Sequence, residues 1–233
     1  MRMRKKKHGE ERLSLCEDFL VSKPNTDTGM PVWLEIGAGK GGFAVGMTAK
    51  NPCVSYFAME RVTDCVVLAA ELAKKRFLEN GECANLKFII DTADNLTKLF
   101  PEDSIDAIFL NFSDPWSKKG YAKRRLTHRR YLSVYFNLLK DGGTLTFKTD
   151  NVGLFDFSLE EIEAMGLELC CMTRDLHASE YASDNVVTEY EAAFSAKGVK
   201  INMLKVRKPI GFKPEIPENL SADFDRSDYI NNK

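Results

Sequence analysis

Long apolar runs are absent from this 233-residue sequence, in which apolar residues occur only in short stretches. A segment that crosses a bilayer needs about 20 consecutive apolar residues, so no membrane span is predicted. The basic amino terminus, MRMRKKKH, continues into charged and polar residues without the apolar core of a signal peptide. We therefore expect a cytoplasmic protein.

Cysteine and histidine are scarce, with six Cys and three His. No Cys-x-x-Cys pair occurs, and few histidines are available as co-ligands, so neither a zinc site nor a disulfide framework is predicted. Most of the cysteines lie inside apolar segments. We expect buried thiols and no metal site.

An excess of positive charge is also absent, because the formal net charge is −1. The charges are nevertheless patterned. Residues 118–130, KKGYAKRRLTHRR, contain Lys and Arg but no acid, whereas residues 214–233 contain five acids and two bases. A solvated helix face can carry such a basic run, but mutual repulsion of so many cations favours a polyanionic partner.

Short apolar runs alternate with longer amphipathic ones, a pattern typical of a parallel α/β sheet. Strands are predicted over 32–36, 54–60, 86–90, 105–112, 144–149, 167–173 and 199–206. Helices are predicted from the glycine turn to Lys50 and over 62–80, 125–139 and 158–165. The fold class is therefore α/β: one doubly wound, Rossmann-like domain with a mostly parallel seven-stranded sheet. Its ligands are expected at the carboxyl ends of the strands.

The two ends of the chain differ from the middle in composition. Residues 1–30 are predicted to form a basic extension and a lead-in helix, 31–210 the α/β domain, and 211–233 an acidic tail. Within these ends, residues 1–12 and 214–233 offer little apolar surface to bury, so we expect them to be poorly ordered.

A glycine-rich turn follows the first predicted strand and opens a helix, with Gly37, Gly39 and Gly42 in the G-x-G-x-x-G pattern. Glu60 ends the next strand, where an acid can accept hydrogen bonds from ribose hydroxyls. Glu35 precedes the glycines; its charge disfavours a pyrophosphate and suits a cationic amino group. S-adenosylmethionine is therefore favoured over NAD.

The third predicted strand ends at a polar segment that would lie beside an adenine ring. Asp91, Thr92 and Asp94 are all candidates for that contact, and the spacing does not choose among them. Asp94 is an equally good candidate for a helix N-cap.

The segment after the fourth strand, residues 111–119, has the sequence NFSDPWSKK. Asp114 can accept hydrogen bonds from the N1–H and N2–H edge of a guanine and can favour the positive charge that develops when N7 is alkylated. Trp116 can stack on a base or close a small core. Guanine N7 carries a lone pair and no proton, so its methylation asks for orientation more than for a general base.

Several motifs occur together and in one order between Trp33 and Arg207: LEIGAGKGGF, the strand-end Glu60, NFSDPWSKKGYAKRRL, TFKTDN and TEYE. In these the chain resembles the bacterial tRNA (guanine-N7)-methyltransferases. The resemblance implies a class I fold that uses S-adenosylmethionine to methylate guanosine 46 in the variable loop of tRNA.

The resemblance also implies roles for individual residues. Asp114 is the implied catalytic residue. The implied cofactor contacts are Glu35, Gly37, Gly39, Glu60, Thr92 and Asp114. Residues implied to hold the tRNA or its target guanine are Lys118, Asp150, Thr188, Glu189, Tyr190 and Glu191. Contacts to RNA are implied for Gly120, Tyr121, Ala122, Lys123, Arg124 and Arg125.

Some of these residues have structural interpretations as well. Without the resemblance, Thr188-Glu-Tyr-Glu191 is a capping box and Asp150 an N-cap. The competing functions are a class I methyltransferase for another base or amine, an NAD-dependent oxidoreductase and a catalytically silent RNA-binding subunit. The sequence is compatible with a monomer or a homodimer.

Overall fold

The computed structural model describes residues 7–78 and 85–217. Its centre is a seven-stranded sheet with the order β3-β2-β1-β4-β5-β7-β6, in which β7 runs antiparallel to both of its neighbours. The strands are β1 (Val32–Ile36), β2 (Ser55–Glu60), β3 (Leu86–Ile90), β4 (Ile105–Asn111), β5 (Leu139–Thr149), β6 (Leu169–Thr173) and β7 (Asn202–Arg207). The predicted doubly wound, mostly parallel sheet is confirmed.

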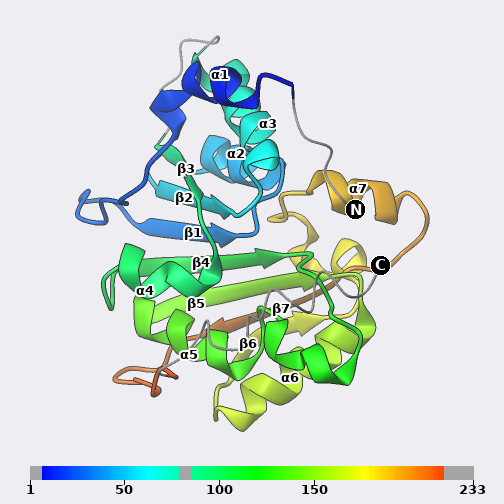
Figure 1. Cartoon of the computed structure of the whole chain (residues 1–233). Helices are drawn as coiled ribbons and strands as arrows, with labels where there is room; N and C mark the ends of the chain where they lie inside the picture. The colour runs from blue at the N-terminus through cyan, green and yellow to red at the C-terminus, as the bar shows by residue number, and fades with distance from the viewer. Residues whose placement is uncertain (1–6, 79–84, 218–233) are drawn as a thin grey trace.

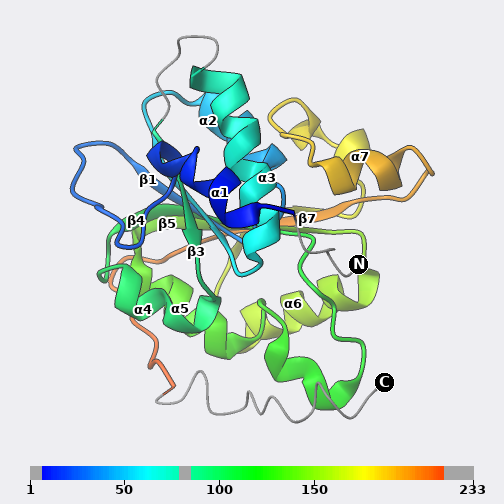
Figure 2. The ribbon, with the colours of Figure 1, turned by 45° about the horizontal axis from the view of Figure 1, so that its top comes forward.

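Helices cover both faces of the sheet (Figures 1 and 2). They are α1 (Gly9–Ser14), α2 (Gly42–Lys50), α3 (Thr63–Ala73), α4 (Leu96–Leu99), α5 (Arg129–Leu138), α6 (Val152–Ala164) and α7 (Glu189–Ser195). The first three lie on one face and α4 to α6 on the other. Alternation along β1 serves both faces: Leu34 packs in the cluster with α5 and α6, and Trp33 packs towards α2.

Three predicted starts were wrong by four residues or more. Helix α5 begins at Arg129 rather than at 125, because Lys119–Arg124 forms a 3₁₀ helix. Strand β5 begins at Leu139 rather than at 144, because it continues through the predicted turn. Helix α6 begins at Val152 rather than at 158, since the Asn151 side chain accepts a hydrogen bond from Leu154 N at 2.8 Å and caps the helix.

The expected disorder of the chain ends was wrong where the structure describes them. Arg12, in α1, donates two hydrogen bonds of 2.7 Å to Glu71 of α3. At the other end, Asn137 Nδ2 donates to the Pro214 carbonyl at 2.6 Å, and Ile216 packs against the main core. Tertiary contacts order these polar segments; residues 1–6 and 218–233 lie outside the described part.

The expectation of buried thiols was also only partly right. Cys16 is buried, but Cys53 and Cys170 are exposed, and Cys83 lies outside the described residues. Within the described ranges, no cluster of His, Cys, Asp and Glu is arranged to hold a metal ion. No helix in those ranges has the length and apolar character needed to cross a membrane.

Candidate active site at the carboxyl edge of the sheet

The glycine turn leaves β1 at the edge where the parallel strands end. Gly39 and Gly41 have φ values of 56° and 78°, in the left-handed region that favours glycine. A Cβ on Gly41 would also lie 2.7 Å from Ala69 Cβ, so only glycine lets this turn pack against α3. At Gly37 and Gly39 the loop has open space where a Cβ would lie, so its backbone is accessible at the sheet edge.

Glu60 ends β2 beside this loop and fixes its shape. One carboxylate oxygen accepts a hydrogen bond from Gly39 N and the other from Val62 N, both at 2.9 Å. The carboxylate is partly exposed. Glu60 is thus held next to the glycine turn.

Glu35 is buried at the end of β1, with 2% of its surface exposed. Asn111 Nδ2 donates to its Oε1 at 3.0 Å, and the Tyr56 hydroxyl lies 3.5 Å from Oε2. Burial raises the pKa of Glu35 to about 7, although Asn111 and the nearby Lys148 favour the carboxylate. A buried carboxyl group this poorly neutralised is suited to binding a cation.

The segment after β3 separates the three candidates for an adenine contact. Asp91 Oδ1 accepts from Thr92 N and Asn95 Nδ2, both at 2.7 Å, and Asp94 Oδ1 accepts from the Tyr131 hydroxyl at 2.8 Å. Both aspartates therefore hold the local fold. Thr92, rather than Asp94, takes the N-cap position, and its hydroxyl has only a 3.5 Å contact with Asp94.

The segment after β4 is strained and held from behind. Phe112 and Trp116 have positive φ values of 52° and 41°, unusual for residues with bulky side chains. Arg125 donates from Nε to the Pro115 carbonyl at 3.0 Å and from Nη2 to the Trp116 carbonyl at 3.1 Å. Asp114 lies within this turn, and its side chain is 69% exposed. The turn therefore presents the Asp114 carboxylate to solvent at the sheet edge.

The predicted RNA-contact segment forms a layered surface next to Asp114. The Arg124 guanidinium carbon lies 5.2 Å from the centre of the Trp116 ring and 4.6 Å from that of Tyr121. Lys118 Nζ lies 6.0 Å from the centre of the Tyr121 ring. Trp116 thus stacks with side chains of the basic run instead of joining a core. Gly120, Ala122 and Lys123 belong to the same 3₁₀ helix.

Helix α7 starts with the predicted capping box: the Thr188 side chain accepts from Glu191 N, and the Glu191 side chain accepts from Thr188 N. Glu189 forms an ion pair of 3.2 Å with Lys40 of the glycine loop. The structural interpretation of this segment is confirmed, and α7 is joined to the glycine loop.

Tyr190 and Asp150 meet at the same edge. The Tyr190 hydroxyl donates to Asp150 Oδ2 at 3.4 Å, and its ring lies 5.0 Å from that of Phe112 and 4.2 Å from that of Phe194. Tyr190 is 44% exposed. Asn151, rather than Asp150, caps α6, so the Asp150 carboxylate is not used as a helix cap.

Lys148 of β5 is the main residue that the sequence reasoning missed. Its side chain is 3% exposed, and Nζ lies 2.7 Å from Glu191 Oε2. The signal was present in TFKT, where a lysine interrupts a strand expected to be buried on both faces. A lysine there needs a buried counter-charge.

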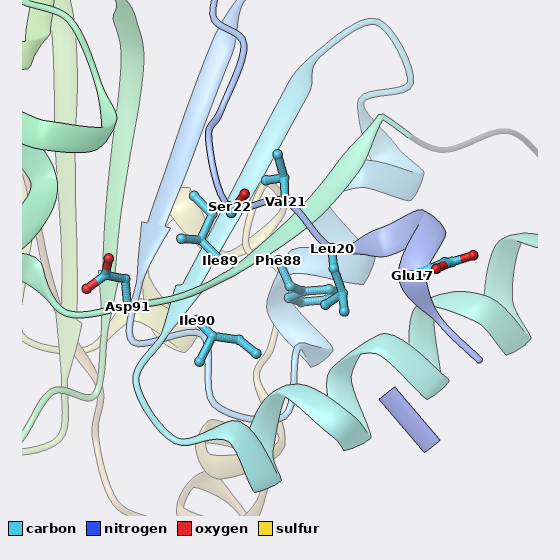
Figure 3. Close-up of a pocket in the computed structure, with 8 residues that line it drawn as sticks. All are labelled: Glu17, Leu20, Val21, Ser22, Phe88, Ile89, Ile90 and Asp91. Carbon is cyan, nitrogen blue, oxygen red and sulfur yellow. The ribbon is translucent and has the colours of Figure 1, made fainter. Parts of the chain in front are cut away.

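A separate pocket lies on the outer side of edge strand β3 (Figure 3). Leu20 lies over the Phe88 ring, and Asp91 stands at the opposite end from Glu17. The pocket is formed because Val21 N donates to the Phe88 carbonyl and draws the segment before β1 onto the sheet edge. It shares Asp91 with the region after β3 but none of the glycine loop.

Solved methyltransferase structures have the same fold. The chain superposes with a TM-score of 0.56 on the structure of an antibiotic-related methyltransferase, at 16% identity, covering 90% of this chain and 97% of the other. It superposes equally well, at 14% identity, on the 16S rRNA methyltransferase KamB, covering 89% and 96%. At these identities the likeness establishes the fold alone.

Sequence comparisons establish the family. A family model described as "Putative methyltransferase" matches residues 29–204. The tRNA (guanine-N(7)-)-methyltransferase of Mesoplasma florum is 41% identical over 221 residues, covering 89% of this chain and 99% of the relative. That of Lysinibacillus sphaericus is 40% identical over 214 residues, covering 88% and 97%. With the motif residues gathered at one sheet edge, the chain belongs to the tRNA (guanine-N7)-methyltransferase family.

Proposed function

We propose that this protein transfers the methyl group of S-adenosylmethionine to N7 of guanosine 46 in the variable loop of tRNA, and that it does so in the cytoplasm. The observation that carries the proposal is the placement of Glu35, Glu60 and Asp114 at the carboxyl ends of the neighbouring strands β1, β2 and β4, with Glu60 bound to the glycine loop. Relatives about 40% identical over most of the chain are named tRNA (guanine-N(7)-)-methyltransferases, which supports the reaction and the class of substrate.

The residues at this edge fit the three parts of S-adenosylmethionine. The buried carboxyl group of Glu35 suits the amino group of the methionine part, because an ion buried there needs an opposite charge. Glu60, which is held beside the glycine turn, is the candidate for the ribose. Thr92, with its neighbouring aspartates held by other groups, is the candidate for the adenine.

Bound there, the cofactor supplies an electrophilic methyl group; the protein has to orient the guanine. The exposed carboxylate of Asp114 can accept from the N1–H and N2–H edge, and it becomes more attractive to the base as N7 gains positive charge. Tyr190 and Phe112 offer aromatic surface beside it. No proton has to leave N7, so we assign no general base.

The basic segment supplies the attraction for the RNA backbone. Lys118, Lys123 and Arg124 lie in or next to the 3₁₀ helix after the Asp114 turn. Phosphate contacts from such residues give affinity and place the substrate without reading its sequence. Arg125 has a different task in this proposal, because its guanidinium holds the two carbonyls of the turn.

The test is methyl transfer from labelled S-adenosylmethionine to unmodified tRNA transcripts, followed by digestion and identification of the nucleoside. The expected product is 7-methylguanosine, which should disappear when guanosine 46 is replaced. Transfer to another atom would contradict the reaction, and transfer that survives the replacement would contradict the position.

A further inference from the structure

Lys148 binds three acceptors, two in the segment that leads into α7 and one in the first turn of α7. Its ammonium group donates to Asn185 Oδ1 at 2.9 Å, to the Val186 carbonyl at 3.1 Å and to Glu191 Oε2 at 2.7 Å. Glu191 is fully buried, with no exposed surface. Asn185 closes the arrangement by donating from Nδ2 to Glu191 Oε1 at 2.6 Å. One buried cation therefore fastens α7 to the sheet.

The same ammonium group also interacts electrostatically with the carboxylate of Glu35. Lys148 of β5 is paired in register with Asn111 of β4, and Asn111 donates to Glu35 of β1. Burial lowers the pKa of Lys148, whereas Glu191 and Glu35 favour its ammonium form, and Lys148 in turn favours the carboxylate of Glu35. The rings of Phe43 and Phe112, centred 4.8 and 5.9 Å from Nζ, cover the ammonium group. Charges in such surroundings interact more strongly than in water.

Lys148 thus lies between two buried carboxyl groups with different partners. Glu35 belongs to the candidate cofactor site, and Glu191 belongs to the helix that presents Tyr190 and Glu189 at the substrate edge. Figure 1 shows α7 on the side towards which the arrows of β1 and β4 point. A change of charge at Glu35 therefore changes the electrostatic energy of the Lys148 ammonium group, which holds α7.

We propose that Lys148 is a positioning residue through which cofactor binding and the docking of α7 favour each other. The inference rests on the proposed function, because it takes Glu35 as the group that binds the amino group of the cofactor. When that amino group neutralises Glu35, Glu191 remains as the carboxylate partner of Lys148, and α7 is held more firmly. When α7 loosens, Lys148 turns to Glu35 and competes with the cofactor.

The proposal assigns Glu191 a role different from base contact. A buried carboxylate that binds Lys148, Asn185 and its own helix cap has no free surface for a guanine. His177 Nε2 also lies 3.1 Å from its Oε1. Glu191 thus influences the binding of S-adenosylmethionine and of tRNA indirectly, through Lys148 and the position of α7.

The test is a cycle of cofactor affinities at pH 8, measured by calorimetry for wild type, Glu191→Gln and the double variant Lys148→Met with Glu191→Gln. Glu191→Gln strands the ammonium group, which should weaken S-adenosylmethionine binding by about tenfold, within the usual range for coupled sites. Removing the stranded cation in the double variant should restore most of that affinity. A double variant that binds no better than the single one would overturn the proposal.

A ligand without the amino group gives the internal control. 5′-Methylthioadenosine keeps the nucleoside and the sulfur but lacks the amino-acid part, so its affinity should be the same in all three proteins. An equal loss of both ligands in Glu191→Gln would mean that Glu191 is merely structural, and that would also overturn the proposal.

A control variant is available at the other end of the parallel strands, where β4 and β5 begin. Lys208 is another buried lysine and donates to Asp103 Oδ1 and to the Leu139 carbonyl, each at 2.7 Å. Asp103→Asn should lower thermal stability without changing cofactor affinity. If Glu191→Gln does not fold, Asn185→Ala removes the amide group that contacts both Lys148 and Glu191, leaves their direct ion pair in place and should weaken S-adenosylmethionine alone. Equal weakening of both ligands in Asn185→Ala would count against the proposal.

The coupling must also appear from the RNA side. S-adenosylhomocysteine should tighten tRNA binding to the wild type, and the factor should disappear in the double variant; an unchanged factor would contradict the coupling. The cofactor cycle needs no RNA. A wild type that binds cofactor but makes no 7-methylguanosine would therefore defeat the proposed substrate while the cycle still decides the role of Lys148.

Discussion

Arg61 and Asp114 form an ion pair across the glycine loop, with Nη2 and Oδ2 3.7 Å apart. Arg61 follows β2 and Asp114 follows β4, and the strand between them is β1, from which the loop emerges. Both side chains are well exposed, at 47% and 69%. Such a pair contributes about 1 kcal/mol or less to stability, so it leaves Asp114 available to a substrate.

Replacing Asp114 should therefore affect catalysis more than folding or cofactor binding. We expect Asp114→Asn to lower kcat by at least about 100-fold, the typical cost of losing one electrostatic contact to a transition state. The dissociation constant of S-adenosylmethionine should change by less than about threefold, a difference below 1 kcal/mol. Single-turnover kinetics and calorimetry measure the two quantities. Undiminished turnover would remove Asp114 from the mechanism.

The affinity for S-adenosylmethionine should depend on pH through Glu35. Burial raises the pKa of this group to about 7 in the free protein. A bound cation favours the carboxylate, so binding releases a proton below pH 7, and affinity should rise with pH and level off above it. Well below pH 7 the change approaches about tenfold per pH unit. Glu35→Gln should bind weakly at every pH; a flat wild-type profile would exclude this role.

The same group should make the free protein less stable as the pH rises. The pKa of Glu35 is higher in the folded protein than its ordinary value of 4.5, so its stabilising contribution is present below about pH 4.5 and is lost as the pH rises through about 7. At pH 8 the free energy of unfolding of Glu35→Gln should exceed that of wild type by up to about 3 kcal/mol. The variant should therefore unfold at a higher denaturant concentration. Equal stability of the two proteins at pH 8 would contradict the raised pKa.

The basic segment should determine the salt dependence of tRNA binding. Replacing Lys123 and Arg124 together by Met should weaken binding and lower the log–log salt slope by roughly 0.7–0.9 for each phosphate that these side chains no longer neutralise. Filter binding over a range of salt concentrations measures the slope. Lys205→Met, on β7, is a control of equal charge type. An unaltered slope in the Lys123 and Arg124 variant would mean that the segment is a solvated helix face without phosphate contacts.

Arg125 should behave differently from its basic neighbours. Its guanidinium donates to the Pro115 and Trp116 carbonyls and lies 4.3 Å from the centre of the Phe157 ring. Arg125→Met should release the strained turn and lower kcat by roughly 10- to 100-fold, since small displacements at a reacting centre are costly. The log–log salt slope of tRNA binding should fall by less than the amount expected for the loss of one phosphate contact. A full decrease of slope with unchanged kcat would identify Arg125 as a phosphate ligand.

The sequence by itself determined the sheet, the edge that carries the site and the family motifs. Alternating apolar runs predict parallel strands, and parallel strands place Glu35, Glu60 and Asp114 at one edge whatever the packing details. The capping box at Thr188 was equally predictable, because its hydrogen bonds form between residues three positions apart.

Tertiary structure alone decided which polar side chains are used up by the fold. Glu191 and Lys148 are 43 residues apart, and Arg125 reaches ten residues back to Pro115; no local pattern encodes either contact. The same holds for the order of the chain ends, since Arg12 is fixed by a carboxylate 59 residues away. Local spacing determines backbone hydrogen bonds, whereas burial of a charge requires a partner that only the folded chain brings close.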